Sequence, residues 1–183
     1  MKKLITSLCL IVTLAFGSFG VGWSGDFQKG VDAYEKGDYA TALKEWTPLA
    51  DQGHAKAQYN LGVAYANGEG VLQDYKTAVK WYILSAEQGN AKAQYNLGIM
   101  YDNGQGVLQD YKTAAKWYIL SAEQGNAEAQ YNLGVMYALG QGVMEDKVYA
   151  HMWGNILNSN GHEDGKKIMD YLLKLGMTPS QIE

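Results

Sequence analysis

The side chains with the most versatile chemistry in this 183-residue chain are three histidines and one cysteine. A zinc site needs three or four ligands that converge on one point, and the spacing of these residues shows no such pattern. Only His151 and His162, together with Glu163–Asp164, form a loose polar group, which is more typical of a solvated surface. We therefore predict that the protein holds no metal and uses no cofactor.

A glycine-rich motif, GxGV, recurs three times, at 68–71, 104–107 and 140–143. Glycine-rich loops cradle phosphates, but a dinucleotide-binding fingerprint needs a preceding strand and a third glycine three residues after the second. That third position holds Gln73, Gln109 and Glu145. Helical patterns flank each motif, so the sequence favours a helix end followed by a turn over nucleotide binding.

Nucleophilic catalysis has no motif to support it. None of the seven serines lies in GxSxG or begins SxxK. A Ser-His-Asp arrangement assembled only by folding stays open as an alternative. The sequence therefore favours a protein that carries out no chemical step, and we predict that it is not an enzyme.

The charge of the chain bears on its partners. Fifteen basic residues, all lysine, face 19 acidic residues, which gives a net charge of -4. A nucleic-acid-binding protein shows a basic patch, and arginine is the side chain best suited to bidentate phosphate recognition. We expect no nucleic-acid partner.

The first twenty residues have the pattern of a secretory signal peptide. Lys2 and Lys3 precede an uncharged apolar run from Leu4 to Phe16, and small residues follow as far as Gly20. The apolar run is shorter than the roughly 20 residues of a membrane span. We predict cleavage after Gly20, which also removes the sole cysteine, and hence a periplasmic or secreted protein without a stable membrane anchor. An uncleaved anchor is the alternative.

The chain repeats itself every 36 residues. Blocks 54–89 and 90–125 agree at 30 of 36 positions, and block 126–161 keeps AQYNLG and GQGV before it drifts. Residues 38–53 match the end of a block, so a partial repeat precedes the first full one. A period of this size indicates stacked supersecondary units.

Each block predicts two helices. In the first block, apolar residues at helical spacing run from Ala55 to Asn67, where Gly68 is a suitable C-cap, and a second helix begins after Asp74 and ends at Gly89. Gly62 lies inside the first helix, where glycine costs about 1 kcal/mol relative to alanine. We expect it, with Gly98 and Gly134, to allow close helix packing under Trp81, Trp117 and Trp153.

The segments AQYNLGVAYANGEGVLQDYKTAVKWYILSAEQG and AQYNLGIMYDNGQGVLQDYKTAAKWYILSAEQG resemble Sel1-like repeats, close relatives of tetratricopeptide repeats. The resemblance covers residues 37–161 and implies an all-α, right-handed superhelical α-solenoid of stacked antiparallel helix hairpins. It assigns structural roles to the following recurring residues: Leu61, Gly62, Tyr65, Gly68, Gly70, Trp81, Leu97, Gly98, Tyr101, Gly104, Gly106, Trp117, Leu133, Gly134, Tyr137, Gly140, Gly142 and Trp153.

In tetratricopeptide repeats the first helix of each hairpin lines a concave groove. By that analogy, the groove residues of this chain are Lys56, Tyr59, Val63, Lys92, Tyr95, Ile99, Asp102, Glu128, Tyr131 and Val135. Tyrosine suits an interface because it offers a large contact area with a hydrogen-bonding tip. The alternative for the tyrosines is a structural role between adjacent first helices.

The resulting organisation is a signal peptide (1–20), a partial repeat or cap hairpin (21–53), three repeats (54–89, 90–125 and 126–161) and a C-terminal capping helix with its tail (162–183). The resemblance implies an exported scaffold that binds another protein, a peptide or an envelope component. Two alternatives stay open: an envelope hydrolase of the β-lactamase-like type assigned to cysteine-rich relatives, whose paired cysteines this chain lacks, and a periplasmic regulator of a signalling receptor.

Overall fold

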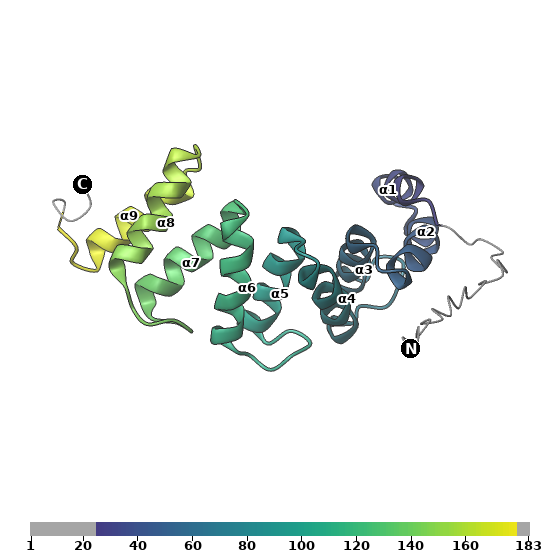
Figure 1. The fold of residues 1–183 in the computed structure, drawn as a ribbon, viewed down its shortest axis with the longest axis horizontal. Coiled ribbons are helices and arrows are strands. Elements are labelled where there is room, and N and C mark those ends of the chain that lie inside the picture. The colour runs from purple at the N-terminus through teal and green to yellow at the C-terminus, as the bar shows by residue number, and fades with distance from the viewer. Residues whose placement is uncertain (1–24, 179–183) are drawn as a thin grey trace, which may run out of the picture.

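The computed structural model describes residues 25–178, which form nine α-helices and no strand (Figure 1). The helices are α1 (Phe27–Glu35), α2 (Tyr39–Asp51), α3 (Ala55–Asn67), α4 (Tyr75–Glu87), α5 (Ala91–Asn103), α6 (Tyr111–Glu123), α7 (Ala127–Leu139), α8 (Lys147–Ser159) and α9 (Asp164–Lys174). Each helix packs against the next, and the hairpins follow one another along an extended array. The predicted α-solenoid of stacked hairpins is confirmed. The predicted signal peptide lies outside the described residues.

Capping side chains fix where the second helix of each hairpin begins. Oδ1 of Asp74 accepts hydrogen bonds from the backbone N–H groups of Lys76 (2.9 Å) and Thr77 (3.2 Å). The Thr77 hydroxyl donates to the other carboxylate oxygen at 2.6 Å. These bonds favour the ionised carboxylate, so they lower the pKa of Asp74, the Thr77 side chain contributing most. The same N-cap recurs at Asp38, Asp110 and Asp146.

Glycines end the first helix of each of the three repeats, α3, α5 and α7, as the sequence predicts. Gly68 has φ 75° and ψ 33°, the left-handed conformation that glycine adopts without steric cost. The second glycine of each GxG motif serves packing. A Cβ atom at Gly70 would lie 2.8 Å from Cβ of Tyr39 and 2.9 Å from Cδ1 of Leu43. The GxG turns are thus close contacts with the preceding hairpin.

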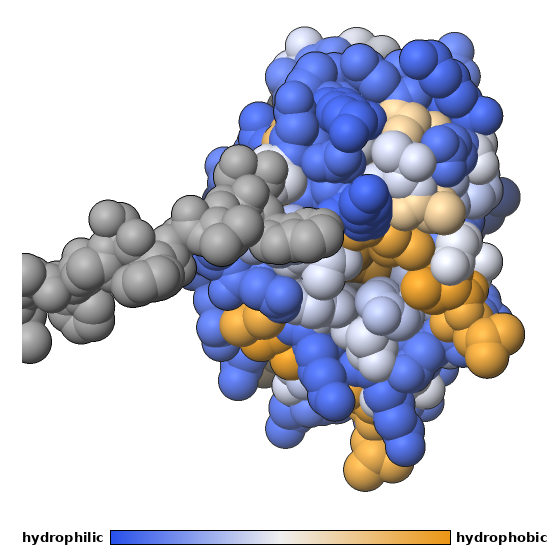
Figure 2. All heavy atoms as spheres, turned by 90° about the vertical axis from the view of Figure 1, so that its right-hand side faces the viewer, coloured by the Kyte–Doolittle hydropathy of each residue, from blue (hydrophilic) through white to orange (hydrophobic). Residues whose placement is uncertain are grey.

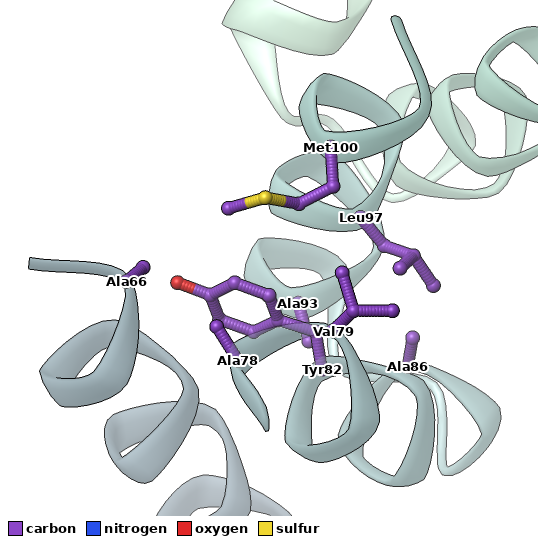
Figure 3. Close-up of a cluster of buried hydrophobic side chains, with 8 residues drawn as sticks. All are labelled: Ala66, Ala78, Val79, Tyr82, Ala86, Ala93, Leu97 and Met100. Atoms are coloured by element: carbon purple, nitrogen blue, oxygen red, sulfur yellow. The ribbon is translucent and has the colours of Figure 1, made fainter. Parts of the chain in front are cut away.

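The core is made mostly of small residues shared between consecutive hairpins. One cluster joins α3, α4 and α5, and Figure 3 shows the Tyr82 ring in its middle. Its members are Ala66, Ala78, Val79, Tyr82, Ala86, Ala93, Leu97 and Met100. Because several of them are alanines, the helices approach closely around one large aromatic ring.

Tyrosines, not the predicted tryptophans, pack over the glycines inside the first helices. A Cβ atom at Gly62 would lie 2.5 Å from Cδ1 and Cε1 of Tyr82, and one at Gly98 would lie equally close to Tyr118. The expectation for Trp81 and Trp117 is wrong because the following residue, about 100° further around the helix, faces the glycine. Both tryptophans are half-buried instead and pack against the core cluster of the preceding hairpin.

The same arrangement extends to the first hairpin. Trp46 lies 36 residues before Tyr82 and is 2% exposed, and its indole ring leaves no room for a side chain at Gly30. Trp46, Tyr82 and Tyr118 therefore form a series of rings that pass from the second helices across to the first helices.

A ladder of polar side chains joins the two helices of each hairpin and links the hairpin to the one before it. The Ser85 hydroxyl donates to the Ala55 carbonyl at 2.7 Å, and the Gln58 amide donates to the Ala50 carbonyl at 3.0 Å. Gln88 in turn donates to Oε1 of Gln58 at 2.7 Å. Ser121, Gln94 and Gln124 repeat the three bonds one period later. The ladder satisfies buried polar atoms, which would otherwise cost stability.

The third repeat packs on α9 in place of a further hairpin. Cδ1 of Ile168, from α9, lies 2.5 Å from where a Cβ of Gly134 would be, so Ile168 fills the position expected for Trp153. Trp153 packs instead against the cluster of α6 and α7. Leu157, Ile168 and Leu172 form a last apolar cluster, in which they are 0–2% exposed. Within residues 25–178, no helix is long and apolar enough to span a membrane.

Candidate binding groove

Three pockets lie along the first helices, on the side where the sequence predicts a groove. One pocket, of about 640 Å³, lies between α3 and α5 and includes Phe27 from α1. We call it the basic pocket because its charged lining residues are both lysines. It is lined by Phe27, Ala55, Lys56, Tyr59, Asn60, Gln88, Gly89, Asn90, Ala91 and Lys92.

A second pocket, of about 420 Å³, lies between α1 and α3 and is called the aromatic pocket. It is lined by Phe27, Val31, Tyr34, Glu35, Trp46, Tyr59, Asn60 and Val63. Because Phe27, Tyr59 and Asn60 line both pockets, the two form one continuous N-terminal groove. Seen onto the α1–α2 end, the surface is mainly hydrophilic, with apolar residues gathered in a few patches (Figure 2).

Tyr59 separates the two pockets and is itself held by aromatic contacts. Its ring centroid lies 6.0 Å from that of Tyr82, and the pair Tyr95–Tyr118 repeats the contact at 5.9 Å. Burial raises the pKa of Tyr59, and a hydrogen bond with Asn96 partly offsets this. Tyr59 is half-buried: it packs against Tyr82 and also lines both pockets of the groove.

A third pocket, of about 480 Å³, lies between α7 and α9 and contains Tyr131 and Val135 from the predicted groove. The rest of its lining comes mainly from α9. It is lined by Tyr131, Gly134, Val135, Ala138, Leu139, Lys167, Ile168, Asp170, Tyr171 and Lys174.

The structure brings some of the predicted groove residues together and leaves others apart. Lys56, Tyr59, Val63 and Lys92 share the N-terminal groove. Tyr95 and Ile99 are half-buried against the core cluster of α6 and α7, and Glu128 is exposed on α7.

Asp102 differs from its equivalents Ala66 and Ala138, which are 8% and 3% exposed. Its carboxylate accepts a hydrogen bond from the Tyr118 hydroxyl at 3.4 Å. Burial raises the pKa of Asp102, and this hydrogen bond partly offsets the effect. Asp102 therefore contacts Tyr118, one of the series of aromatic rings, near the C-terminal end of α5.

Sequence reasoning missed the contribution of the first hairpin to the groove. Phe27, Val31 and Tyr34 from α1, and Trp46 from α2, line it, but α1 precedes the residues that match the repeat. Their spacing of i, i+4 and i+7 is the available signal, since such residues share one helix face.

The described residues contain no group of three or more histidine, cysteine or carboxylate side chains that could hold a metal. His54, an exposed residue, caps α3: its Nδ1 accepts the Ala57 N–H at 3.1 Å. The features that the groove does offer are aromatic rings, amides and lysines.

Antiparallel α-hairpins stacked at a fixed 36-residue period define a helical-repeat solenoid. The family model of the Sel1 repeat matches residues 55–90, 91–126 and 127–162, which make up more than half of the chain. The protein therefore belongs to the Sel1 repeat family, whose members are typically non-catalytic scaffolds for protein–protein interaction.

Two solved structures are similar to this chain in both sequence and fold. The c5321 protein of uropathogenic Escherichia coli, described as a protective antigen displaying an SLR fold, is 36% identical with a TM-score of 0.77 over 84% of this chain. A Sel1 repeat protein from Oxalobacter formigenes is 31% identical with a TM-score of 0.73 over 76% of this chain. The chain spans only 35% and 58% of their respective lengths.

The Helicobacter pylori cysteine-rich protein B shares the fold, with a TM-score of 0.54 over 80% of this chain and 99% of its own length. At 16% identity, the likeness concerns the fold alone. A comparison with curated protein sequences gives no significant match.

Proposed function

We propose that this protein is an exported scaffold that binds a segment of another polypeptide along the face formed by α1, α3, α5 and α7. One observation carries the proposal: the basic and aromatic pockets join at Phe27, Tyr59 and Asn60 into a groove that crosses three helices. A groove of this length suits an extended peptide or a single helix better than a large folded surface.

The groove is suited to recognition because its walls are held in place. Trp46 and Tyr82 fill the spaces beside Gly30 and Gly62. The Ser85 and Gln88 hydrogen bonds join α4 to α3, and the bond from Gln58 to the Ala50 carbonyl ties this hairpin to the previous one. A binding surface that is ordered before its ligand arrives loses less entropy on association.

Photo-crosslinking in living cells tests which face binds. We would place benzoylphenylalanine at Val63 or Val135, both half-buried on first helices, and at Leu84 or Leu120 as controls, each 43% exposed on a second helix. Because the ligand is expected on the first helices, adducts with a polypeptide should form at the first pair at least about fivefold more often. Equal labelling at the control pair would contradict the proposal.

The proposed export is supported by the basic start and the apolar run of the first twenty residues. Fractionation of cells followed by N-terminal sequencing tests it. We expect the periplasmic or secreted fraction to contain a chain that begins at Val21. A chain that keeps Met1 in the cytoplasmic fraction would contradict export without touching the binding proposal.

A further inference from the structure

We propose that the N-terminal groove selects a peptide segment in which carboxylate groups are followed by large apolar side chains. This inference rests on the proposed function and names the chemistry of the ligand. The carboxylates would lie in the basic pocket and the apolar side chains in the aromatic pocket, with Tyr59 between them.

The charge of the basic pocket argues for the carboxylates. Lys56 and Lys92 line it, and its lining contains no aspartate or glutamate. Both lysines are exposed, and within residues 25–178 neither forms an ion pair. Two unpaired cations therefore face one pocket in a chain whose net charge is -4, and a negative ligand would be attracted to this place.

Amide groups extend the polar part of this pocket. Asn60 and Asn90 lie in its lining beside the two lysines, whereas the Gln88 amide, also in the lining, already donates to Gln58 and to the Leu84 carbonyl. Side-chain amides donate hydrogen bonds that a carboxylate can accept without any further charge. The lysines attract a negative charge, and the amides form directional hydrogen bonds. Together they favour a carboxylate over a neutral group.

The aromatic pocket has the opposite character. Phe27, Val31, Trp46 and Val63 give it an apolar lining, with Glu35 as its charged residue. Glu35 disfavours a ligand carboxylate at this end, while the aromatic rings provide apolar area for a large side chain. The two pockets thus set the direction of the ligand as well as its composition.

The lysines of the first helices do not continue into the third repeat. The position of Lys56 and Lys92 is occupied by Glu128 one period later. A long polyanion bound along the whole array would therefore meet a negative charge at the third repeat, so the change of sign argues for a short ligand. A peptide fits better than an acidic polysaccharide, because a polysaccharide lacks the apolar side chains that the aromatic pocket would bury.

Fluorescence anisotropy with defined peptides tests the inference on the purified chain. The probes are labelled Glu-Glu-Ala-Leu-Phe, its charge-reversed form Lys-Lys-Ala-Leu-Phe, and Glu-Glu-Ala-Ser-Ser, which lacks the apolar part. We expect the first to bind at least about tenfold more tightly than either other peptide, and its affinity to fall as salt is added.

A pair of double variants locates the site. Lys56→Glu with Lys92→Glu should weaken binding of Glu-Glu-Ala-Leu-Phe at least about tenfold, because two attractive charges become repulsive. Lys80→Glu with Lys116→Glu makes the same change of charge at exposed positions of α4 and α6, and should alter binding by less than about twofold. Unchanged melting curves would show that all four substitutions leave the fold intact.

Three results would overturn the inference: equal binding of the charge-reversed peptide, equal weakening by both double variants, or equal competition by polygalacturonate, an acidic polymer without apolar side chains. If no peptide binds while crosslinks persist at Val63, the proposed ligand chemistry is wrong and the scaffold function stands. If the crosslinks are also absent from the first helices, the proposed function itself fails.

Discussion

The hairpins α5–α6 and α7–α8 meet the same packing requirement with different side chains. Gly98 and Gly134 occupy equivalent positions in the first helices, and each leaves a notch that must be filled. Tyr118, from the same hairpin, fills the first notch, whereas Ile168, from α9, fills the second. The position equivalent to Tyr118 is Gly154, which is buried.

This difference explains how the array ends. With glycine at 154, α9 can approach α8, and the carbonyl oxygen of Gly154 lies directly against Gly165. Leu157 occupies the position of Ser85 and Ser121, whose hydroxyls bond to the first helix of their own hairpin, and it packs against Ile168. The hairpin α7–α8 is thus suited to pack against the capping helix α9, whereas α5–α6 is suited to pack against another hairpin.

The largest expected effect follows from the burial of the cap. Leu172 is fully buried against the third repeat, whereas its neighbour Leu173 is 42% exposed. Leu172→Asp places a charge in an apolar cluster, so we expect a loss of at least about 3 kcal/mol and a fall in melting temperature of roughly 10 °C.

Leu173→Asp is the matched control, and thermal unfolding followed by circular dichroism compares the two variants. The control should melt within roughly 2 °C of the parent chain, because its side chain is already in contact with water. Equal melting temperatures for the two variants would show that α9 does not cap the solenoid. Deletion of residues 162–183 should expose the same cluster and cause aggregation.

The second prediction compares the two notches directly. Gly98→Ala should destabilise the protein by about 1–3 kcal/mol, because its Cβ would lie 2.5 Å from two ring carbons of Tyr118. At Gly134 the nearest atom is the end of the flexible Ile168 side chain, and the next is 3.4 Å away. Gly134→Ala should therefore cost less than about 1 kcal/mol, offset by its gain in helix propensity.

Urea denaturation of both variants gives the two free energies of unfolding. A similar loss at both positions would mean that the aromatic ring is no more rigid than the isoleucine. If only Gly134→Ala lowered the free energy of unfolding, the rigid contact would lie at Gly134 with Ile168 and not at Gly98 with Tyr118.

Helix caps and helix boundaries could be predicted from the sequence because they depend on residues that are close together in the chain. The Asp74 cap, the left-handed Gly68 and the 36-residue period each depend on neighbouring residues, and the glycines inside the first helices indicated close packing. The occupant of each notch was not accessible in this way. Trp81 and Tyr82 are adjacent and both aromatic, so only the rotation of the helix decides which one faces Gly62.

The groove residues could be predicted only in part, for a related reason. Lys56, Tyr59 and Lys92 lie on repeats, where the family analogy places them. Phe27 and Trp46 come from a hairpin whose helices are joined by a much shorter turn, so the period does not align α1 with α3. Contacts between hairpins depend on how the array curves, and no single segment encodes that curvature.

The smallest expected effect concerns the polar ladder, which breaks at the third repeat. Gln88 and Gln124 donate to Oε1 of Gln58 and Gln94, but the next equivalent residue is Asn160. Asparagine is one methylene shorter, and Oε1 of the buried Gln130 has no hydrogen-bond partner within the described structure. Asn160→Gln should restore the bond and raise the free energy of unfolding by about 1 kcal/mol.

Gln124→Asn is the reciprocal change, since it shortens the donor at an intact step of the ladder. It should leave Oε1 of Gln94 without a partner and cost about 1–3 kcal/mol, because an unmet buried acceptor costs more than one net hydrogen bond contributes. Urea denaturation of the two single variants measures both changes. If Gln124→Asn destabilises while Asn160→Gln has no effect, the ladder is sound but α8 has moved away from α7 to receive α9. Opposite shifts of the two variants would instead show that the third hairpin keeps the geometry of the others and differs only in the length of this side chain.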